Sequence, residues 1–286
     1  MLDFIKKLLG LNPENQSKES SEDNAQDIEP SDILERLQPL IESTATTCIG
    51  ITTKKEATLA LESSKFGGFP YIPEEMDIPI DGQNQTMRLL AQINFAELPH
   101  LELLPKEGLL QFYISEDEIY GLDFDNPISQ KGWKVLFFEK LDFTPRKNFG
   151  GIYQDKWASS PLLIAPLSLA FKLKKDYPNY PSIEYYQHIQ PLFEKIEEGD
   201  YVDFLEDLYI DRAESMGHKI GGYPYYTQNE IREFKKHFSD YQLLLQIDSD
   251  GDKIMWGDVG VANFFIKKED LIKKDFSKVL YNWDCH

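Results

Sequence analysis

One phrase occurs twice in this 286-residue chain, and it constrains the fold more than any other feature of the sequence. The first copy, SKFGGFPYI, begins at Ser64, and the second, HKIGGYPYY, begins at His218. The two copies are 154 positions apart (218 − 64), and the segments LLAQI and LLLQI that follow them keep this offset. Further on, GLLQFYI and GVANFFI align at an offset of 152 (260 − 108). Ordered matches at nearly one offset indicate an internal duplication.

Short apolar runs of strand length, bounded by Gly, Pro and Asp, make up most of the remaining sequence. They are TTCIGITTKKEAT, MRLLAQINF, GLLQFYIS, WKVLFFEKL, LSLAFKLKK, LLLQIDSD, KIMWGD and VANFFIK. Helical spacing appears in SDILERLQPLIEST and between Ser182 and Ser215, with a break near Gly199. Strands joined by short connections favour antiparallel pairing. We therefore predict an α+β fold of mostly antiparallel sheet, with two related halves about a pseudo-twofold axis and peripheral helices.

The chain divides into an N-terminal segment and one globular domain. Residues 1–30 predict a short amphipathic helix followed by a flexible acidic tether, because the stretch after the helix is polar and has no aromatic residue. Residues 31–286 predict a single domain. Its expected parts are a first repeat at about 56–175, a helical insert at about 182–216 and a second repeat at about 217–286.

Composition excludes some classes of partner. The 49 acidic residues exceed the 30 basic ones, and a net charge of −19 argues against a nucleic acid ligand. The same charge suits a basic protein partner, or serves solubility alone. Two cysteines do not make a disulfide framework, which indicates a reducing compartment and a cytoplasmic location. No run approaches the ~20 apolar residues of a membrane span, although residues 1–11 have the pattern of a helix that contacts a membrane surface, a partner or its own domain.

The segments KFGGFPYIP…LLAQINFAELP…PKEGLLQFYI and GGYPYY…LLLQIDSD…WGDVGVANFFI carry a family resemblance. From about Glu56 to Asp270 the chain resembles the YwqG-like family of uncharacterised bacterial proteins. The resemblance implies a mixed, mostly β fold with an internal duplication. It implies no established activity.

The two glycine phrases are the first candidate site. Their paired glycines permit positive φ angles or a close approach of another chain. A lysine beside successive glycine N–H groups has the composition of a small anion nest, and the alternative is a tightly packed turn with an exposed lysine. The candidate binding residues of the two phrases are Lys65, Gly67, Gly68, Tyr71, Lys219, Gly221, Gly222 and Tyr223.

Four further residues are candidates. Gln92 and Gln246 interrupt apolar strands at equivalent positions, and a buried amide must find hydrogen-bond partners. We predict that each glutamine bonds the backbone of the neighbouring glycine turn and clamps it. Trp256 and Asp258 have no counterpart in the first copy, which makes them candidates for function. For Asp258 the alternatives are an acid, a ligand for a basic group, or a cap on its own turn.

Metal and cofactor motifs are not evident in the sequence. QIDSDGDKIMWGD has three aspartates at alternating positions, as a calcium loop does, but lysine and valine stand where glycine and glutamate are required. Asp250-Gly251 is instead typical of a hairpin turn. The five histidines and two cysteines lack metal-site spacing, and no P-loop, GxGxxG or GxSxG motif occurs. We expect no cofactor and no metal.

Two functional hypotheses follow. The first is a non-catalytic cytosolic interaction module that binds a basic protein partner. The alternative is a small-ligand binder or enzyme with its site in a cleft between the two repeats, lined by the glycine turns of both copies and Asp258. A concave pocket where Lys65, Lys219 and Asp258 converge would favour the alternative. The sequence leaves open whether the protein is an enzyme and what its oligomeric state is.

Overall fold

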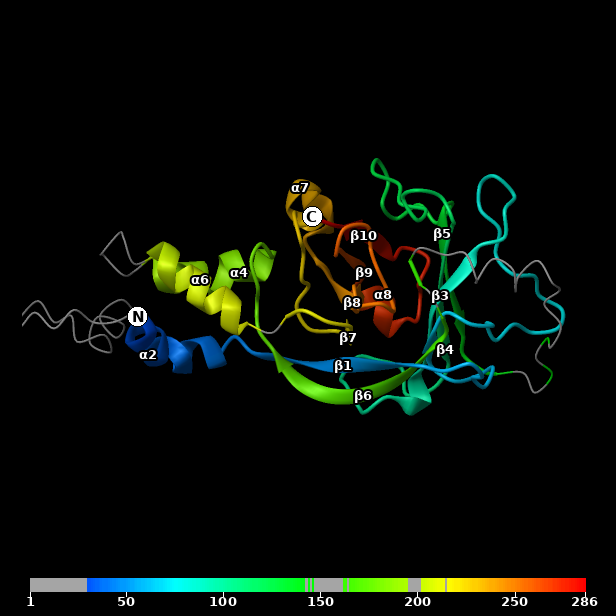
Figure 1. The fold of residues 1–286 in the computed structure, drawn as a ribbon, viewed down its shortest axis with the longest axis horizontal. Helices are drawn as coiled ribbons and strands as arrows, with labels where there is room; N and C mark the ends of the chain where they lie inside the picture. The colour runs from blue at the N-terminus through cyan, green and yellow to red at the C-terminus, as the bar shows by residue number, and fades with distance from the viewer. Residues whose placement is uncertain are drawn as a thin grey trace, which may run out of the picture.

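The computed structural model describes residues 30–141, 144, 146, 162–163, 165–194, 202–213 and 215–286. In this part of the chain ten strands form one sheet, in the order β10-β9-β8-β7-β1-β6-β2-β3-β4-β5 (Figure 1). All neighbouring strands are antiparallel, which confirms the predicted mostly antiparallel α+β fold. The helix and tether predicted before Pro30 lie outside the described residues.

Helices and strands are interspersed along the chain. The strands are β1 (Thr46–Lys55), β2 (Lys65–Phe66), β3 (Arg88–Asn94), β4 (Leu109–Ile114), β5 (Trp133–Phe138), β6 (Leu167–Asp176), β7 (Lys219–Ile220), β8 (Tyr241–Asp248), β9 (Val261–Lys267) and β10 (Leu280–Asp284). The helices are α2 (Pro30–Glu42), α4 (Ile183–His188), α5 (Gln190–Phe193), α6 (Val202–Arg212), α7 (Ile231–Phe234) and α8 (Lys268–Ile272), with 3-10 turns η2 (Phe95–Glu97) and η3 (Lys236–Phe238).

Two long strands form the centre of the sheet. β1 and β6 pair over ten residues each, from Thr46 opposite Asp176 to Lys55 opposite Leu167. The two-residue strand β7 lies on the other side of β1, and the two-residue strand β2 lies on the other side of β6. Each short strand leads to a three-stranded meander, β8–β10 or β3–β5. β1 therefore joins the meander β8–β10 through β7, and β6 joins the meander β3–β5 through β2.

The sheet curves around a shared hydrophobic core (Figure 1). Phe112 on β4 and Phe264 on β9 have ring centroids 4.6 Å apart. Trp133 on β5 packs on Tyr281 of β10 at 5.4 Å, so side chains of the first and last strands of the sheet meet. The loop between β4 and β5 also reaches β10, where Tyr281 N donates to Pro127 O. The two meanders thus share one core.

The helices α2, α4, α5 and α6 form a separate cluster beside the sheet (Figure 1). In α2 the buried residues Leu34, Leu37 and Ile41 recur at helical spacing and lie in this cluster. The Oγ of Ser182 accepts from Tyr185 N and caps α4. These helices are peripheral, as predicted. Among the described residues, no helix combines the length and the apolar character needed to cross a membrane.

Two strand predictions differ from the structure. KIMWGD is not a strand: Ile254 makes only isolated bridges to Leu163 and Asp250, and the segment turns instead. The side chain of Ser249 stabilises the turn, because its Oγ accepts from Trp256 N. This bond replaces the backbone hydrogen bond that Trp256 N would make in a strand. β10 was not predicted, since it has only five residues, two of which are the polar Asn282 and Asp284, and its strand pattern is weak.

Candidate functional site

Each two-residue strand ends in a double-glycine turn with left-handed backbone. Gly67 and Gly68 have φ of 69° and 74°, and Gly221 and Gly222 have φ of 69° and 80°. L-amino acids with side chains adopt this region at a cost, so the turns explain why both phrases contain paired glycines. At these turns the chain changes direction, and β2 and β7 end.

Gln246 clamps the second turn. Its Oε1 accepts from Tyr225 N at 2.8 Å, and its Nε2 donates to Ser215 O at 3.0 Å and Gly217 O at 2.7 Å. Asn263 on the next strand donates to Tyr225 O at 2.8 Å. The amide is fully buried, and these bonds satisfy it.

Gln92 holds the first turn in the same way. Its Oε1 accepts from Tyr71 N at 2.9 Å, and its Nε2 donates to Leu61 O and Ser63 O, both at 2.7 Å. Gln111 on the next strand donates to Tyr71 O at 2.6 Å. The predicted glutamine clamps are therefore confirmed in both halves.

The first lysine does not face an external anion. Lys65 is 1% exposed, and its Nζ donates to Ala60 O at 2.7 Å and Leu61 O at 2.9 Å. Burial lowers the pKa of this amine to about 8, against the opposing effect of Glu62 and Glu97. Neither the anion nest nor the exposed lysine expected from the sequence describes this side chain.

The second lysine meets an anion that the protein itself supplies. Lys219 Nζ lies 2.8 Å from Asp176 Oδ2, and neither side chain is exposed to solvent. The same oxygen accepts from Tyr223 N at 2.8 Å, so Asp176 ties the glycine turn to the end of β6. Burial lowers the pKa of Lys219, and the charge of Asp176 opposes that shift. A Cβ on Gly222 would lie 2.2 Å from Asp176 Oδ2, so only glycine fits here.

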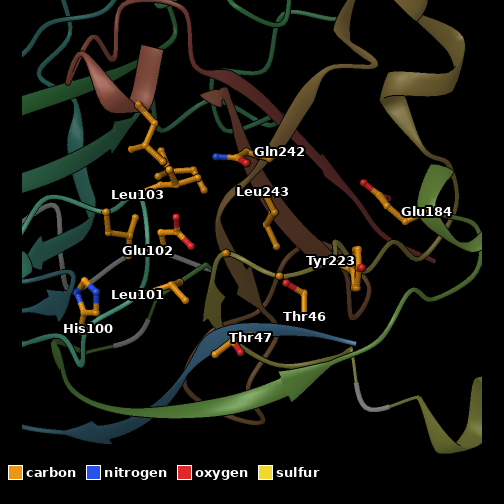
Figure 2. A pocket seen from close by; sticks show the side chains of 15 residues that line it. Thr46, Thr47, His100, Leu101, Glu102, Leu103, Glu184, Tyr223, Gln242 and Leu243 are labelled. Atoms are coloured by element: carbon orange, nitrogen blue, oxygen red, sulfur yellow. The ribbon is translucent and has the colours of Figure 1, made fainter. Parts of the chain in front are cut away.

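A pocket of about 590 Å³ opens beside this second turn (Figure 2). It lies between the beginnings of β1 and β8, the loop that follows η2, and α4. The lining residues are Thr46, Thr47, His100, Leu101, Glu102, Leu103, Leu104, Glu184, Gly221, Gly222, Tyr223, Gln242, Leu243, Leu244 and Leu271. Segments from both predicted repeats and from the helical insert therefore contribute to one pocket.

The charges that line the pocket are negative. Neither lysine nor arginine is among the lining residues. Glu102 is exposed, and no described residue forms an ion pair with it. Glu184 binds Arg232 with both oxygens, at 3.0 and 2.8 Å, but Arg232 also binds the buried Glu230 at 2.6 Å. Two carboxylates share one guanidinium, which leaves this side of the pocket with a net charge of −1.

Tyr223 forms part of the pocket wall. Its hydroxyl donates to Thr44 O at 2.7 Å, which fixes the ring at the beginning of β1. Burial raises the pKa of this phenol, and the charges of Glu184 and Asp176 add to the effect. The group stays protonated at neutral pH and acts as a hydrogen-bond donor.

The first turn has a proline beside it. A Cβ on Gly68 would lie 3.3 Å from Pro166 Cβ, so the residue before β6 packs directly on that turn. Of the predicted site residues, Gly221, Gly222 and Tyr223 line the pocket, and Lys219 and Gln246 support it from behind. The first-copy residues Lys65, Gly67, Gly68, Tyr71 and Gln92 do not line it.

Trp256 and Asp258 lie elsewhere. Trp256 is fully buried and packs on Tyr120 at 5.4 Å and Trp283 at 5.9 Å, so it is a core residue. Asp258 is exposed in the following turn, and its backbone oxygen accepts from His286 N. Lys65, Lys219 and Asp258, whose convergence in a pocket would have favoured a cleft site, do not converge: both lysines are buried in different strands, and none of the three lines the pocket.

The aspartates of the calcium-like segment are bonded within the protein. Asp250 accepts from Thr53 Oγ1 at 2.5 Å and Lys253 Nζ at 2.9 Å, and Asp252 binds Lys55 at 2.5 Å. Among the described residues no group of three or more His, Cys, Asp or Glu could hold a metal ion. The segment is a charged turn that packs on β1.

His218 is buried beneath this turn, and the lowered pKa of its imidazole predicts that the stability of the protein depends on pH. Burial lowers the pKa of His218 to about 4, although Asp250 at 3.6 Å opposes the shift. An unfolded histidine binds its proton near pH 6.5, so the unfolded chain binds more protons between about pH 4 and 6.5. We expect the free energy of unfolding to fall by about 3 kcal/mol as the pH is lowered through this window.

Urea unfolding of the wild type and His218→Asn across this window measures the effect. In the wild type Asp248 N donates to His218 Nδ1. Asparagine keeps a hydrogen-bond acceptor for Asp248 N, but its side chain does not titrate. His218→Asn should lose most of the pH dependence, and the exposed-histidine control His237→Asn should keep it. An unchanged pH dependence in His218→Asn would contradict the assignment.

The fold and the pocket together define an α+β protein with a pocket between its sheet and an adjoining loop, and the charged side chains that line this pocket are acidic. A family model described as a domain of unknown function (DUF1963) matches residues 64–285, and the chain belongs to that family. No curated protein matches the chain.

Proposed function

We propose that this protein is a binding module for a basic segment of a partner protein, and that the pocket beside Gly221–Tyr223 is its binding site. The observation that carries the proposal is the lining of the pocket. It contains Glu102 without an ion-pair partner among the described residues and Glu184 in a cluster of net negative charge, and it contains no lysine or arginine. A cation is the ligand that such a lining favours.

The apolar lining supports a protein segment as the source of that cation. Leu101, Leu103, Leu104, Leu243, Leu244 and Leu271 line the same pocket. Apolar surface beside a few oriented polar groups is typical of binding sites, and the net charge of −19 attracts a basic partner at long range.

Replacing Glu102 with glutamine tests this proposal. We expect Glu102→Gln to weaken partner binding by about tenfold or more, because a desolvated interfacial charge pair is lost. Pull-down from the source cell, at low and at physiological salt, compares this variant with the wild type. Glu107→Gln is the matched control, an exposed glutamate of the same segment that does not line the pocket. Equal recovery by all three proteins, or no stoichiometric partner at either salt, would contradict the proposal.

A small cationic ligand is the second candidate. The volume of about 590 Å³ lies within the usual range of small-molecule sites, roughly 300–1,000 Å³. A rise in melting temperature with a soluble amine, lost in Glu102→Gln, together with no protein partner, would favour this candidate.

We also propose that the chain is an internal duplication within a YwqG-like family and acts in the cytoplasm. Equivalent pairings support the duplication: Lys65 lies opposite Gln92, Lys219 lies opposite Gln246, and each meander has its irregularity two residues before its glutamine. Cys48 and Cys285 are unpaired, which suits a reducing compartment.

A further inference from the structure

The pocket coincides with a slot in the sheet. β7 is only two residues long, and it pairs with β1 on one side and β8 on the other. Ile220 lies opposite Ile49 of β1, but β1 begins three residues further out, at Thr46. On the other side Ile220 lies opposite Leu245, and β8 begins at Tyr241. Gly221 N still donates to Leu244 O at 3.3 Å. Past Gly221 the two outer strands continue, while the strand between them has ended.

The backbone of β1 offers hydrogen bonds to this slot. Ile51 N donates to His218 O, so the backbone groups of Ile51 point to the side of β7. In an antiparallel strand this direction alternates, so Ile49 and Thr47 point to the same side. Ile49 is opposite Ile220, whereas Thr47 lies beyond the end of β7. The N–H and C=O of Thr47 therefore face the slot.

The backbone of β8 faces the slot from the opposite side. Tyr281 N donates outward to Pro127 O, so the backbone N–H and C=O of the preceding residue, Leu280, point inward to Phe265 of β9. Leu243 also lies opposite Phe265, whose backbone groups are taken by Leu280. The N–H and C=O of Leu243 consequently point away from β9, to the side that β7 has left.

The lining of the pocket agrees with this geometry. Thr46 and Thr47 line it together, and so do Gln242 and Leu243 (Figure 2). Leu244 also lines the pocket. Successive residues of a strand point to opposite faces of the sheet, so a pocket that touches consecutive residues reaches the edge of the strand. The pocket is open to the backbone edges of two strands.

The first half provides an internal comparison. Phe66, the last residue of β2, lies opposite Leu167, and Leu167 is the first residue of β6. The long strand thus ends where the short one ends, and Pro166 covers the turn. At the corresponding end, β1 outruns β7 whereas β6 does not outrun β2.

We infer that the partner segment binds in extended conformation between β1 and β8, as a continuation of β7 that completes the sheet. This inference rests on the proposed function and specifies its mode of recognition. Main-chain bonds to Thr47 and Leu243 would supply affinity, as in other cases of strand addition. Alternate side chains of an extended segment lie on one face, so a basic residue can reach Glu102 while its neighbours do not.

Backbone methylation of the ligand tests the inference without changing the protein. A library of acetylated and amidated basic pentapeptides is screened against the full chain by fluorescence polarisation. The best binder is then made with N-methyl groups on alternate backbone nitrogens, in each of the two registers. A strand inserted between two strands donates on both sides, so we expect both methylated forms to bind at least about tenfold more weakly. Amide hydrogen exchange should also slow at Thr47 and Leu243 when the unmethylated peptide binds.

The outcomes separate the inference from the function on which it rests. Loss of binding in only one methylated register would indicate addition to one edge and would overturn insertion. Equal binding of all three peptides, with weakened binding to Glu102→Gln, would overturn the strand geometry and leave the proposed function standing. If no pentapeptide of the library binds, both are overturned.

Discussion

Gly222→Ala is expected to lower the free energy of unfolding by about 4 kcal/mol. Two costs combine at this position. Its φ of 80° disfavours any residue with a Cβ, and the new Cβ would lie 2.2 Å from Asp176 Oδ2 and 2.8 Å from Cys48 Cβ. The carboxylate cannot retreat without leaving Lys219, whose Nζ it binds at 2.8 Å. Chemical denaturation measures the change, and binding at the pocket should be lost with it.

Two other glycines separate these costs. Gly217 has φ of 87° but nothing within 4 Å of an added Cβ, so Gly217→Ala should cost only about 1–2 kcal/mol. Gly82 has neither constraint, and Gly82→Ala should change stability by less than about 1 kcal/mol. If Gly222→Ala costs no more than Gly217→Ala, Asp176 does not hold the turn as described.

Asp176→Asn should destabilise the protein by about 3–5 kcal/mol at neutral pH. The substitution leaves the Lys219 ammonium fully buried without a counter-ion. The pKa of Lys219 is already lowered by burial, and loss of the carboxylate would lower it further. Above the folded-state pKa the unfolded chain binds more protons, so the stability of Asp176→Asn should rise with pH toward the ordinary lysine pKa. Unfolding curves at neutral and alkaline pH measure this trend against the wild type.

Removing both charges provides the control. Asp176→Asn combined with Lys219→Met replaces the buried pair with neutral groups, and it should recover much of the lost stability and abolish the alkaline trend. A double variant as unstable as Asp176→Asn alone would mean that the unpaired charge of Lys219 is not what destabilises Asp176→Asn.

The elements with strong local patterns could be predicted from the sequence. The alternation in β6, the apolar runs of β3 and β8 and the helical spacing in α2 are all local. The glutamine clamps were also accessible, because a buried amide has few ways to be satisfied and the repeat places both beside a glycine turn. The segment KIMWGD has the residues of a strand. It forms a turn instead, because Trp256 N donates to Ser249 Oγ and Gly251 has a left-handed backbone conformation.

The pocket itself could not be predicted, because its residues are brought together by pairing over long sequence distances. Thr47, Glu102 and Glu184 carry no motif and come from three separate elements. Asp176 meets Lys219 only because β6 and β7 flank the same strand. Trp256, a candidate because the first copy has no counterpart, is a core residue. The difference that opens the pocket is the length of β1 beyond β7.

The order of strands in the sheet also bears on how the chain is made. A ribosome releases β1 first among the strands, yet its neighbours β6 and β7 begin at Leu167 and Lys219. β2 likewise lacks one neighbour until β6 has emerged. Contacts of such long sequence separation form slowly, and unpaired strand edges invite association with other chains. The nascent chain therefore carries an open β1 edge through most of its synthesis, until β6 and β7 have emerged and pair with it.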